Sequence, residues 1–189
     1  NTVAMKVPVF STEKLPQVEV SLGPEMRSTG EVLGVGQNFH EAMYKGFTAA
    51  GTTIPKAGST ILVTVREMDK ENFLPIAKKF HELGCKFIAT AGTAKLLEDN
   101  DIPVQVAKKI SEGVPNILDV IRSGMIDLII DIPKKGNDIH SDGFKIRRTA
   151  IECDVSIMTS LDTVKALVDV MEHRYTPDTV EVISLSDIK

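Results

Sequence analysis

A regular alternation of apolar runs and helix-forming segments over residues 58–189 constrains the fold of this chain most strongly. Runs such as Leu128-Ile129-Ile130 are continuous rather than alternating, which is typical of parallel strands covered by helices on both faces. Short strands that alternate with helices and connect by right-handed crossovers predict an α/β fold, with a parallel five-stranded sheet between two helical layers. The expected strands are residues 60–65, 85–90, 103–107, 127–131 and 155–159, followed by a last strand at 179–185. The expected helices are residues 69–83, 92–97, 115–123, 143–153 and 162–173.

Residues 1–57 lack the regular alternation of strands and helices seen after residue 58. Pro and Gly residues interrupt the stretch before residue 37, so only an edge strand at 5–10 is expected there. Asn38 can cap a helix over residues 39–50, with Glu41 at the capping-box position and Gly51 as the stop. One strand, a long loop and one helix cannot bury a core alone. We therefore predict that residues 1–57 are a piece of a neighbouring domain, or a strap across the domain at 58–189.

Composition excludes several classes of protein. The 22 Lys and Arg residues against 26 Asp and Glu give a net charge of −4, so no overall basic field indicates nucleic-acid binding. No apolar run approaches the roughly 20 residues of a membrane helix, and no signal-peptide pattern is present. Two cysteines cannot build a disulfide framework or a zinc site, which favours a reduced, cytoplasmic setting. Because the first residue is Asn1, we expect a processed chain or a piece of a longer one.

The turn at residues 90–93 is the strongest candidate for a binding site. In parallel sheets, ligands collect beyond the carboxyl ends of the strands, next to helix N-termini. Gly92 permits close approach of a ligand, and the hydroxyls of Thr90 and Thr93 lie beside unpaired N–H groups, a combination that suits a phosphate. Lysines near strand ends would add positive charge, namely Lys70, Lys108, Lys109, Lys134 and Lys135. The alternative is that Thr93 only caps its helix and the lysines are solvated.

Other motifs support no catalytic or metal-binding assignment. His140-Ser141-Asp142 is more typical of a loop hydrogen-bond cluster than of a catalytic set, because adjacent residues rarely point at one atom. Asp127 and Asp131 are expected on one strand face, which does not establish paired-carboxylate catalysis. The histidines lack metal-ligand spacing, and Gly34-x-Gly36 lacks the strand–turn–helix setting of a dinucleotide site. Arg147 and Arg148 are expected on a solvated helix face, with binding of an acidic partner as the alternative.

Several longer motifs resemble the large chain of carbamoyl-phosphate synthase. Residues 7–10 (VPVF) and 22–34 (LGPEMRSTGEVLG) resemble the end of its second ATP-grasp synthetase domain. The segments that resemble its carboxy-terminal regulatory domain, which has a methylglyoxal-synthase-like fold, are DKE at 69–71, ATAGTA at 89–94, KISEGVPNI at 109–117, SGMIDLII at 123–130 and IRR at 146–148.

The resemblance implies an allosteric module that binds a nucleoside monophosphate such as UMP or IMP. In that family the phosphate and ribose contacts come from the positions of Lys70, Thr90, Thr93 and Lys109, with Gly92 in the same turn. The implied parent is a ligase that uses glutamine or ammonia, bicarbonate, ATP and Mg or Mn to make carbamoyl phosphate for pyrimidine and arginine synthesis. The implied partners are the rest of the large chain and a small glutaminase subunit. This stretch itself is expected to need no cofactor, to hold no metal and to be non-catalytic.

Two departures qualify the implied function. Members that respond to nucleotides usually carry Asn-Thr where this chain has Asp131-Ile132, and an aspartate there could repel a phosphate or accept from a ribose. An effector-insensitive, arginine-pathway type with a vestigial pocket, acting mainly in homo-oligomer formation, is therefore the alternative. Methylglyoxal synthase itself has a catalytic aspartate near the position of Val114, which cannot abstract a proton. That lyase activity is not expected.

Overall fold

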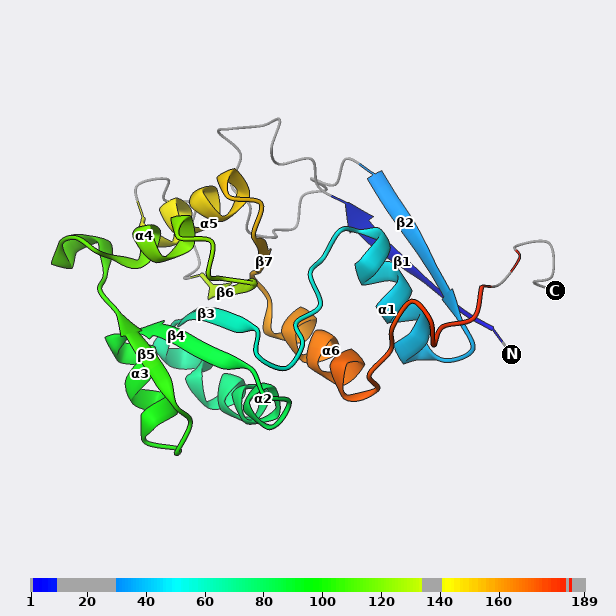
Figure 1. Ribbon diagram of the computed structural model, residues 1–189, viewed down its shortest axis with the longest axis horizontal. Coiled ribbons are helices and arrows are strands. Elements are labelled where there is room, and N and C mark those ends of the chain that lie inside the picture. Colours follow the sequence, from blue (N-terminus) through cyan, green and yellow to red (C-terminus); the bar gives the residue numbers. More distant parts are fainter. Residues whose placement is uncertain (1, 10–29, 134–140, 183, 185–189) are drawn as a thin grey trace.

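Residues 58–182 build a parallel five-stranded sheet between two layers of helices, as the sequence predicts. The computed structural model describes residues 2–9, 30–133, 141–182 and 184 (Figure 1). The strand order is β5-β4-β3-β6-β7, and every neighbouring pair is parallel. The strands are β3 (Thr60–Val65), β4 (Lys86–Thr90), β5 (Val104–Ala107), β6 (Leu128–Ile132) and β7 (Ser156–Met158). All five expected strands are confirmed, with ends that differ by no more than one residue.

Within the described residues, four α-helices and two short 3₁₀ turns lie between these strands, and a fifth helix, α6, follows β7. The helices are α2 (Lys70–Glu82), α3 (Ala91–Glu98), α4 (Ile117–Arg122), α5 (Asp142–Glu152) and α6 (Leu161–Glu172), and the turns are η2 (Glu67–Asp69) and η3 (Ile110–Glu112). Asp69 precedes α2 as expected, but its carboxylate pairs with Arg66 instead of capping the helix. Pro75 lies inside α2, one turn beyond its start.

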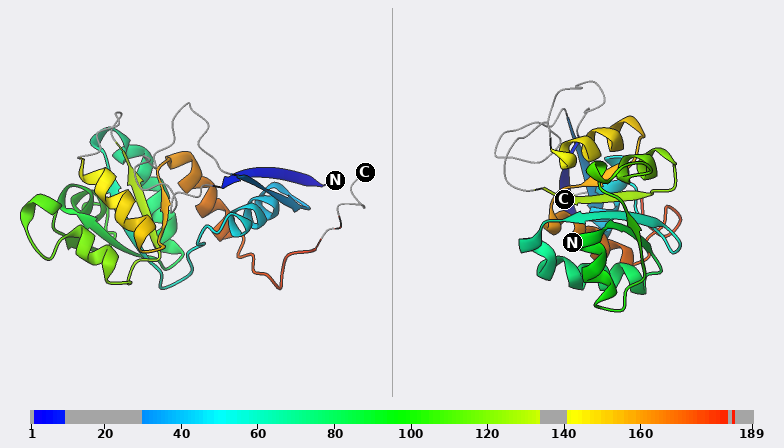
Figure 2. Two further views of the ribbon diagram at one scale, coloured as in Figure 1. Left: turned by 90° about the horizontal axis from the view of Figure 1, so that it is seen from above. Right: turned by 90° about the vertical axis from the view of Figure 1, so that its left-hand side faces the viewer.

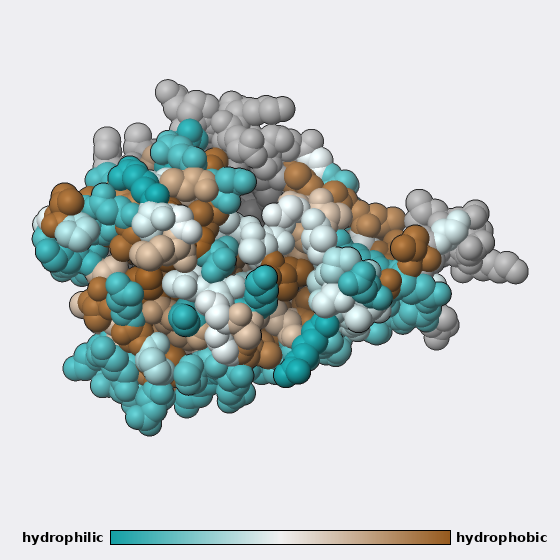
Figure 3. Space-filling view, viewed as in Figure 1, coloured by the Kyte–Doolittle hydropathy of each residue, from teal (hydrophilic) through white to brown (hydrophobic). Residues whose placement is uncertain are grey.

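Alternate residues of each strand divide the core between the two faces of the sheet. Ile61 and Val63 of β3 pack with Phe73 and Phe80 of α2, in a cluster that also includes α3 and α6. Leu62, on the opposite face of β3, belongs to a second cluster with residues of α4 and α5. The sheet is therefore covered on both sides, which explains its continuous apolar runs. Hydrophilic residues cover the outer surface of α2 and α3 (Figure 3).

The N-terminal unit differs from the prediction. It contains β1 (Val3–Val9), β2 (Gly30–Gly36) and α1 (Phe39–Ala49), and the two strands pair antiparallel. The sequence predicts no strand at β2, because Gly30, Gly34 and Gly36 are typical of turns. A side chain at Gly34 would collide with the backbone of Ala42, and one at Gly36 would lie 2.6 Å from the backbone nitrogen of Ala42. These glycines therefore let α1 lie directly on β2.

Helix α6 connects the two units. It lies between α2 and α1 (Figures 1 and 2). Tyr44 and Phe47 of α1 belong to the same hydrophobic cluster as Leu167 and Val168 of α6. The division of the chain at residue 57 stays a prediction, and the apolar core is continuous across it.

The segment after α6 returns to the N-terminal unit. The expected strand at 179–185 is wrong for residues 179–182, while 183 and 185 lie outside the described residues. Thr176 and Thr179 close a turn, in which the Thr179 N–H donates to the Thr176 carbonyl over 3.0 Å. Glu181 then directs its backbone groups to side chains of α1, so they are not available for a strand ladder. Among the described residues, no helix is long and apolar enough to cross a membrane.

Candidate functional site

The predicted site residues are distributed along the carboxyl edge of four adjacent strands. Lys109 follows β5, Thr90 ends β4, Lys70 follows β3 and Asp131 lies in β6, in the spatial order of the sheet. Neighbouring strands lie about 4.8 Å apart, so these positions span roughly 14 Å of the edge. That length suits a ligand larger than a single phosphate.

The turn from β4 into α3 and the first residue of α2 lie together. Thr90 is the N-cap residue of α3 in extended conformation, and its side chain makes no capping hydrogen bond. The ammonium nitrogen of Lys70 lies 3.8 Å from the position that a Cβ on Gly92 would take. Lys70 therefore places a positive charge directly over the N-terminal turn of α3, as the phosphate-site hypothesis requires.

Lys70 and Thr93 already have partners within the chain. The Lys70 ammonium pairs with the exposed carboxylate of Glu67 over 2.6 Å. Thr93 is buried, and its hydroxyl oxygen accepts a 3.3 Å hydrogen bond from the Val65 N–H. This bond ties the start of α3 to the end of β3. The Thr93 hydroxyl proton remains able to donate.

Lys109 lies at the outer end of the edge. Its side chain is exposed, and its backbone N–H donates to the Glu112 carboxylate over 2.8 Å, which fixes the turn η3. Lys108 beside it is also exposed. Lys134 and Lys135 lie outside the described residues.

Asp131 is held in a buried ion pair. Its carboxylate accepts from the Arg147 guanidinium over 2.5 Å, and the two side chains are 4% and 3% exposed. The expectation that Arg147 lies on a solvated face is wrong, because α5 turns it against the sheet. Gly143 makes this possible, since a Cβ there would lie 2.9 Å from the guanidinium nitrogen. The Asp131 carboxylate is therefore buried and paired within the fold, and little of it is exposed at the edge.

The pairing of Asp131 with Arg147 is the feature of the site that the sequence reasoning missed. A signal for it exists, because an aspartate at the end of an apolar strand needs a cation nearby. Gly143 and Arg147 are also four residues apart on one helix, which lets the long side chain pass over the glycine.

The described residues present no catalytic arrangement. Ser141 caps α5, with its hydroxyl oxygen accepting from the Phe144 N–H over 3.2 Å, and His140 lies outside the described residues. Burial, with a smaller contribution from Asp127, raises the pKa of the Cys85 thiol to about 11, so it stays protonated at neutral pH. Within ranges 2–9, 30–133 and 141–182, no three His, Cys, Asp or Glu residues are placed to hold a metal ion.

Val114 and Asp127 also contribute no catalytic group. Val114 is an exposed apolar residue at the tip of a loop. Asp127 lies before β6, and its carboxylate accepts from the Thr60 N–H over 2.7 Å at the amino end of the sheet. Asp127 and Asp131 therefore lie at opposite ends of one strand, which rules out a shared carboxylate pair.

Comparison with known proteins identifies the relatives of this chain. The model of the MGS-like domain family matches residues 72–159. A carbamoyl phosphate synthase large chain of Clostridium botulinum (strain Loch Maree / Type A3) is 53% identical over 185 residues, which is 98% of this chain and 17% of that protein. The large chain of Clostridium perfringens (strain 13 / Type A) is 52% identical over 97% of this chain and 17% of its own length. That of Clostridium beijerinckii is 55% identical over 92% of this chain and 16% of its own length.

The matched region runs from within α2 to just past β7, so it includes β4, β5, β6 and β7, while β3 and Lys70 precede it. The chain spans about 17% of the length of the curated relatives it matches. It therefore contains an MGS-like domain and is homologous, over nearly its whole length, to the carbamoyl phosphate synthase large chains.

Proposed function

We propose that this chain is the regulatory region of a carbamoyl phosphate synthase large chain and binds a nucleoside monophosphate such as UMP or IMP at the carboxyl edge of its sheet. The observation that carries the proposal is the position of the Lys70 ammonium over Gly92, at the N-terminal turn of α3. A phosphate there would meet a cation, free backbone N–H groups and the Thr90 hydroxyl.

The rest of the edge suits the remainder of a nucleotide. Lys109 lies two strands from Lys70 and is exposed, so it can contact a ligand that extends along the edge. Asp131 on the other side is paired with Arg147. Because its side chain is only 4% exposed, Asp131 places little negative charge beside a phosphate bound at Lys70.

Catalysis would reside elsewhere in the parent protein. We propose that the parent makes carbamoyl phosphate from glutamine or ammonia, bicarbonate and ATP, with Mg or Mn, and works with a small glutaminase subunit. The present chain would act on that reaction only by binding an effector and altering how residues 1–57 meet the rest of the large chain.

Calorimetric titration and thermal unfolding with UMP and IMP test the proposal. Ligand at about 100 times its Kd should stabilise the chain by about 2.7 kcal/mol. For this size of domain that raises the Tm by roughly 5–10 °C. Lys70→Met should weaken binding roughly 10- to 100-fold, because it removes a charge-assisted hydrogen bond. Lys95→Met, at the other end of α3 and exposed, is the matched control.

A second candidate is an oligomerisation module with a vestigial pocket. The favouring observation is that Lys70 and Thr93 have partners within the chain, and Ile132 is buried in the core rather than offering a polar group. Absence of any Tm shift with millimolar UMP or IMP, together with a mass that rises with concentration in light scattering, would favour it over effector binding.

A further inference from the structure

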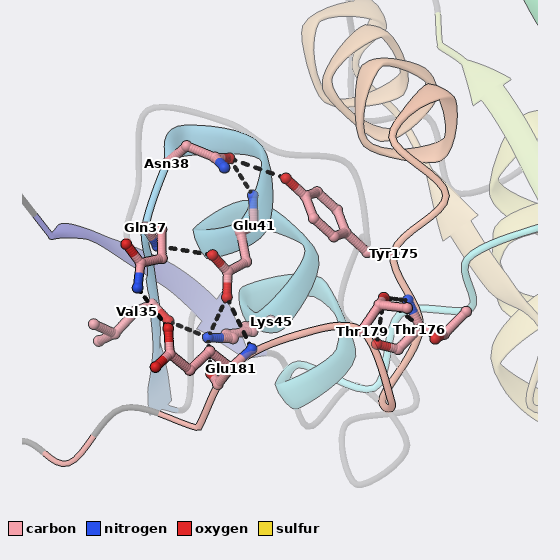
Figure 4. A network of polar contacts seen from close by, with 9 residues as sticks. All are labelled: Val35, Gln37, Asn38, Glu41, Lys45, Tyr175, Thr176, Thr179 and Glu181. Carbon is pink, nitrogen blue, oxygen red and sulfur yellow. Dashed lines mark hydrogen bonds and ion pairs between the residues drawn. The ribbon is translucent and has the colours of Figure 1, made fainter.

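The segment after α6, residues 173–182, fastens the five-stranded domain to the N-terminal unit (Figure 4). The His173 ring stacks on His40 of α1 with 4.0 Å between ring centroids. The Tyr175 ring lies 5.8 Å from that of Tyr44, and its hydroxyl donates to the Asn38 side chain over 3.2 Å. These contacts join the C-terminal end of α6 to the N-terminal end of α1.

Glu181 makes the second attachment. Its backbone N–H donates to the Glu41 carboxylate over 3.3 Å, and its backbone carbonyl accepts from the Lys45 ammonium. Its side chain accepts from the Gln37 amide. Glu41 is buried, so these partners and Lys45, at 2.7 Å, replace the water that its carboxylate has lost. The segment is therefore bonded to α1 along two turns of the helix.

Helix α6 is also tied to α2 on its other side. The Lys79 ammonium forms ion pairs with Asp169, at 3.0 Å, and with Glu172, at 2.9 Å. Both carboxylates lie in the last turns of α6, so Lys79 joins α2 to that end of α6. Both hydrogen-bonded carboxylates raise the pKa of Lys79, Glu172 more than Asp169. Lys79 is on the same helix as Lys70, which begins at the candidate effector site.

We propose that α2, Lys79, α6 and residues 173–182 form a mechanical link that couples the candidate effector site to α1 of the N-terminal unit. A ligand that draws Lys70 toward the α3 turn displaces the start of α2. A close-packed core transmits strain between neighbouring elements, so Lys79, about 13 Å further along α2, carries the displacement to the last turns of α6. Residues 173–182 then transfer it to α1. The ligand-dependent part of this coupling rests on the proposed function, and the link between α2 and α1 does not.

Hydrogen exchange of the intact chain tests the link without any ligand. Lys79→Met removes both ion pairs and should make amides of α1 (Phe39–Ala49) exchange about 3- to 10-fold faster, while amides of α4 on the opposite face keep their rates. Lys78→Met is the matched control, because Lys78 is the exposed neighbour on the same helix. Lys79→Arg keeps the charge and should restore slow exchange. Unchanged exchange in α1 of Lys79→Met, or an equal change in Lys78→Met, would overturn the link.

A second arm uses UMP as the probe. In the unaltered chain UMP should slow exchange in both α3 and α1. In Lys79→Met, calorimetry should give the same UMP affinity within twofold, and exchange should slow in α3 but no longer in α1. Slowing in α1 that persists in Lys79→Met contradicts the proposed coupling. If neither UMP nor IMP alters exchange in α3 or gives a heat of titration, the proposed function fails, and the link is still decided by the ligand-free comparison.

Discussion

The ion pair of Asp131 with Arg147 sets the net charge at this part of the carboxyl edge. An aspartate buried without a partner would be protonated or would destabilise the fold, because burial disfavours its charged form. The guanidinium of Arg147 lies 2.5 Å from the carboxylate, so each group has a counter-charge inside the protein. The pair leaves little net charge at the edge. The Lys70 ammonium then supplies the positive charge available to a phosphate there.

Replacing one partner of this pair should be costly. Arg147→Met leaves the Asp131 carboxylate buried without its cation and should lower the free energy of unfolding by about 3–5 kcal/mol. Urea denaturation measures the change. Combining it with Asp131→Asn should recover part of the loss, since no buried charge then remains. Lys145→Met, exposed on the same helix, is the control and should change stability by less than about 0.5 kcal/mol.

The two cysteines should differ sharply in reactivity. Cys85 is buried at the start of β4, and its raised pKa of about 11 leaves roughly a hundredfold less thiolate than an ordinary cysteine carries. Cys153, at the end of α5, is only half-buried. Iodoacetamide at pH 8 should therefore label Cys153 in the native chain and both cysteines in urea. Rapid labelling of native Cys85 would contradict the burial that raises its pKa.

At the scale of elements, strand β2 depends on glycines that look like turn signals. Gly34 and Gly36 face α1, and the backbone of that helix fills the space where their side chains would be. Gly46 of α1 does the same for β1, since a Cβ there would lie 2.6 Å from the Val7 side chain. The N-terminal unit therefore packs backbone against backbone, which compensates for its small number of large apolar side chains.

Alanine at these glycines should separate α1 from β2. Gly34→Ala or Gly36→Ala forces the helix backbone to shift and should destabilise the chain by about 1–3 kcal/mol. Gly30→Ala is a matched control in the same strand, because nothing lies within 4 Å of its Cβ position. Hydrogen exchange in α1 and urea denaturation both report the effect. Equal stability of Gly30→Ala and Gly34→Ala would show that the close approach does not matter.

The five-stranded sheet could be predicted because its signals are local. Continuous apolar runs such as Leu128–Ile130 fix each strand within a few residues of sequence. The candidate site was predictable only in part, since parallel topology places strand ends together without stating what each side chain contacts. The pairing of Asp131 with Arg147 joins residues on different elements. The need for a glycine at position 34 comes from the close approach of α1, which follows it in the chain. Such contacts leave little trace in local periodicity.

At the scale of the whole molecule, one buried carboxylate joins residues 173–182 to the N-terminal unit, beside the apolar contacts between α1 and α6. Glu41 is 5% exposed and accepts hydrogen bonds from the Gln37 and Glu181 N–H groups, at 2.8 and 3.3 Å. Lys45 adds an ion pair. These partners come from the turn after β2, from α1 and from residues 173–182. Ionisation of Glu41 therefore holds together parts of the chain that are 140 residues apart.

Acid should loosen this junction before it affects the sheet. Burial alone would raise the pKa of Glu41, but the Lys45 ion pair and the hydrogen bonds outweigh it and lower the pKa below its ordinary value of 4.5. A carboxylate with a lowered pKa stabilises the fold above its unfolded pKa, and that stability disappears as the pH falls through the folded value. The free energy of unfolding should therefore drop below about pH 4.5, with exchange in α1 accelerating first.

Glu41→Gln should be less stable by about 1–3 kcal/mol at pH 7 and should lose less stability between pH 5 and 3. The control Glu71→Gln, exposed on α2, should keep the pH dependence of the unaltered chain. Parallel pH curves for Glu41→Gln and the unaltered chain would mean that ionised Glu41 does not hold the two units together.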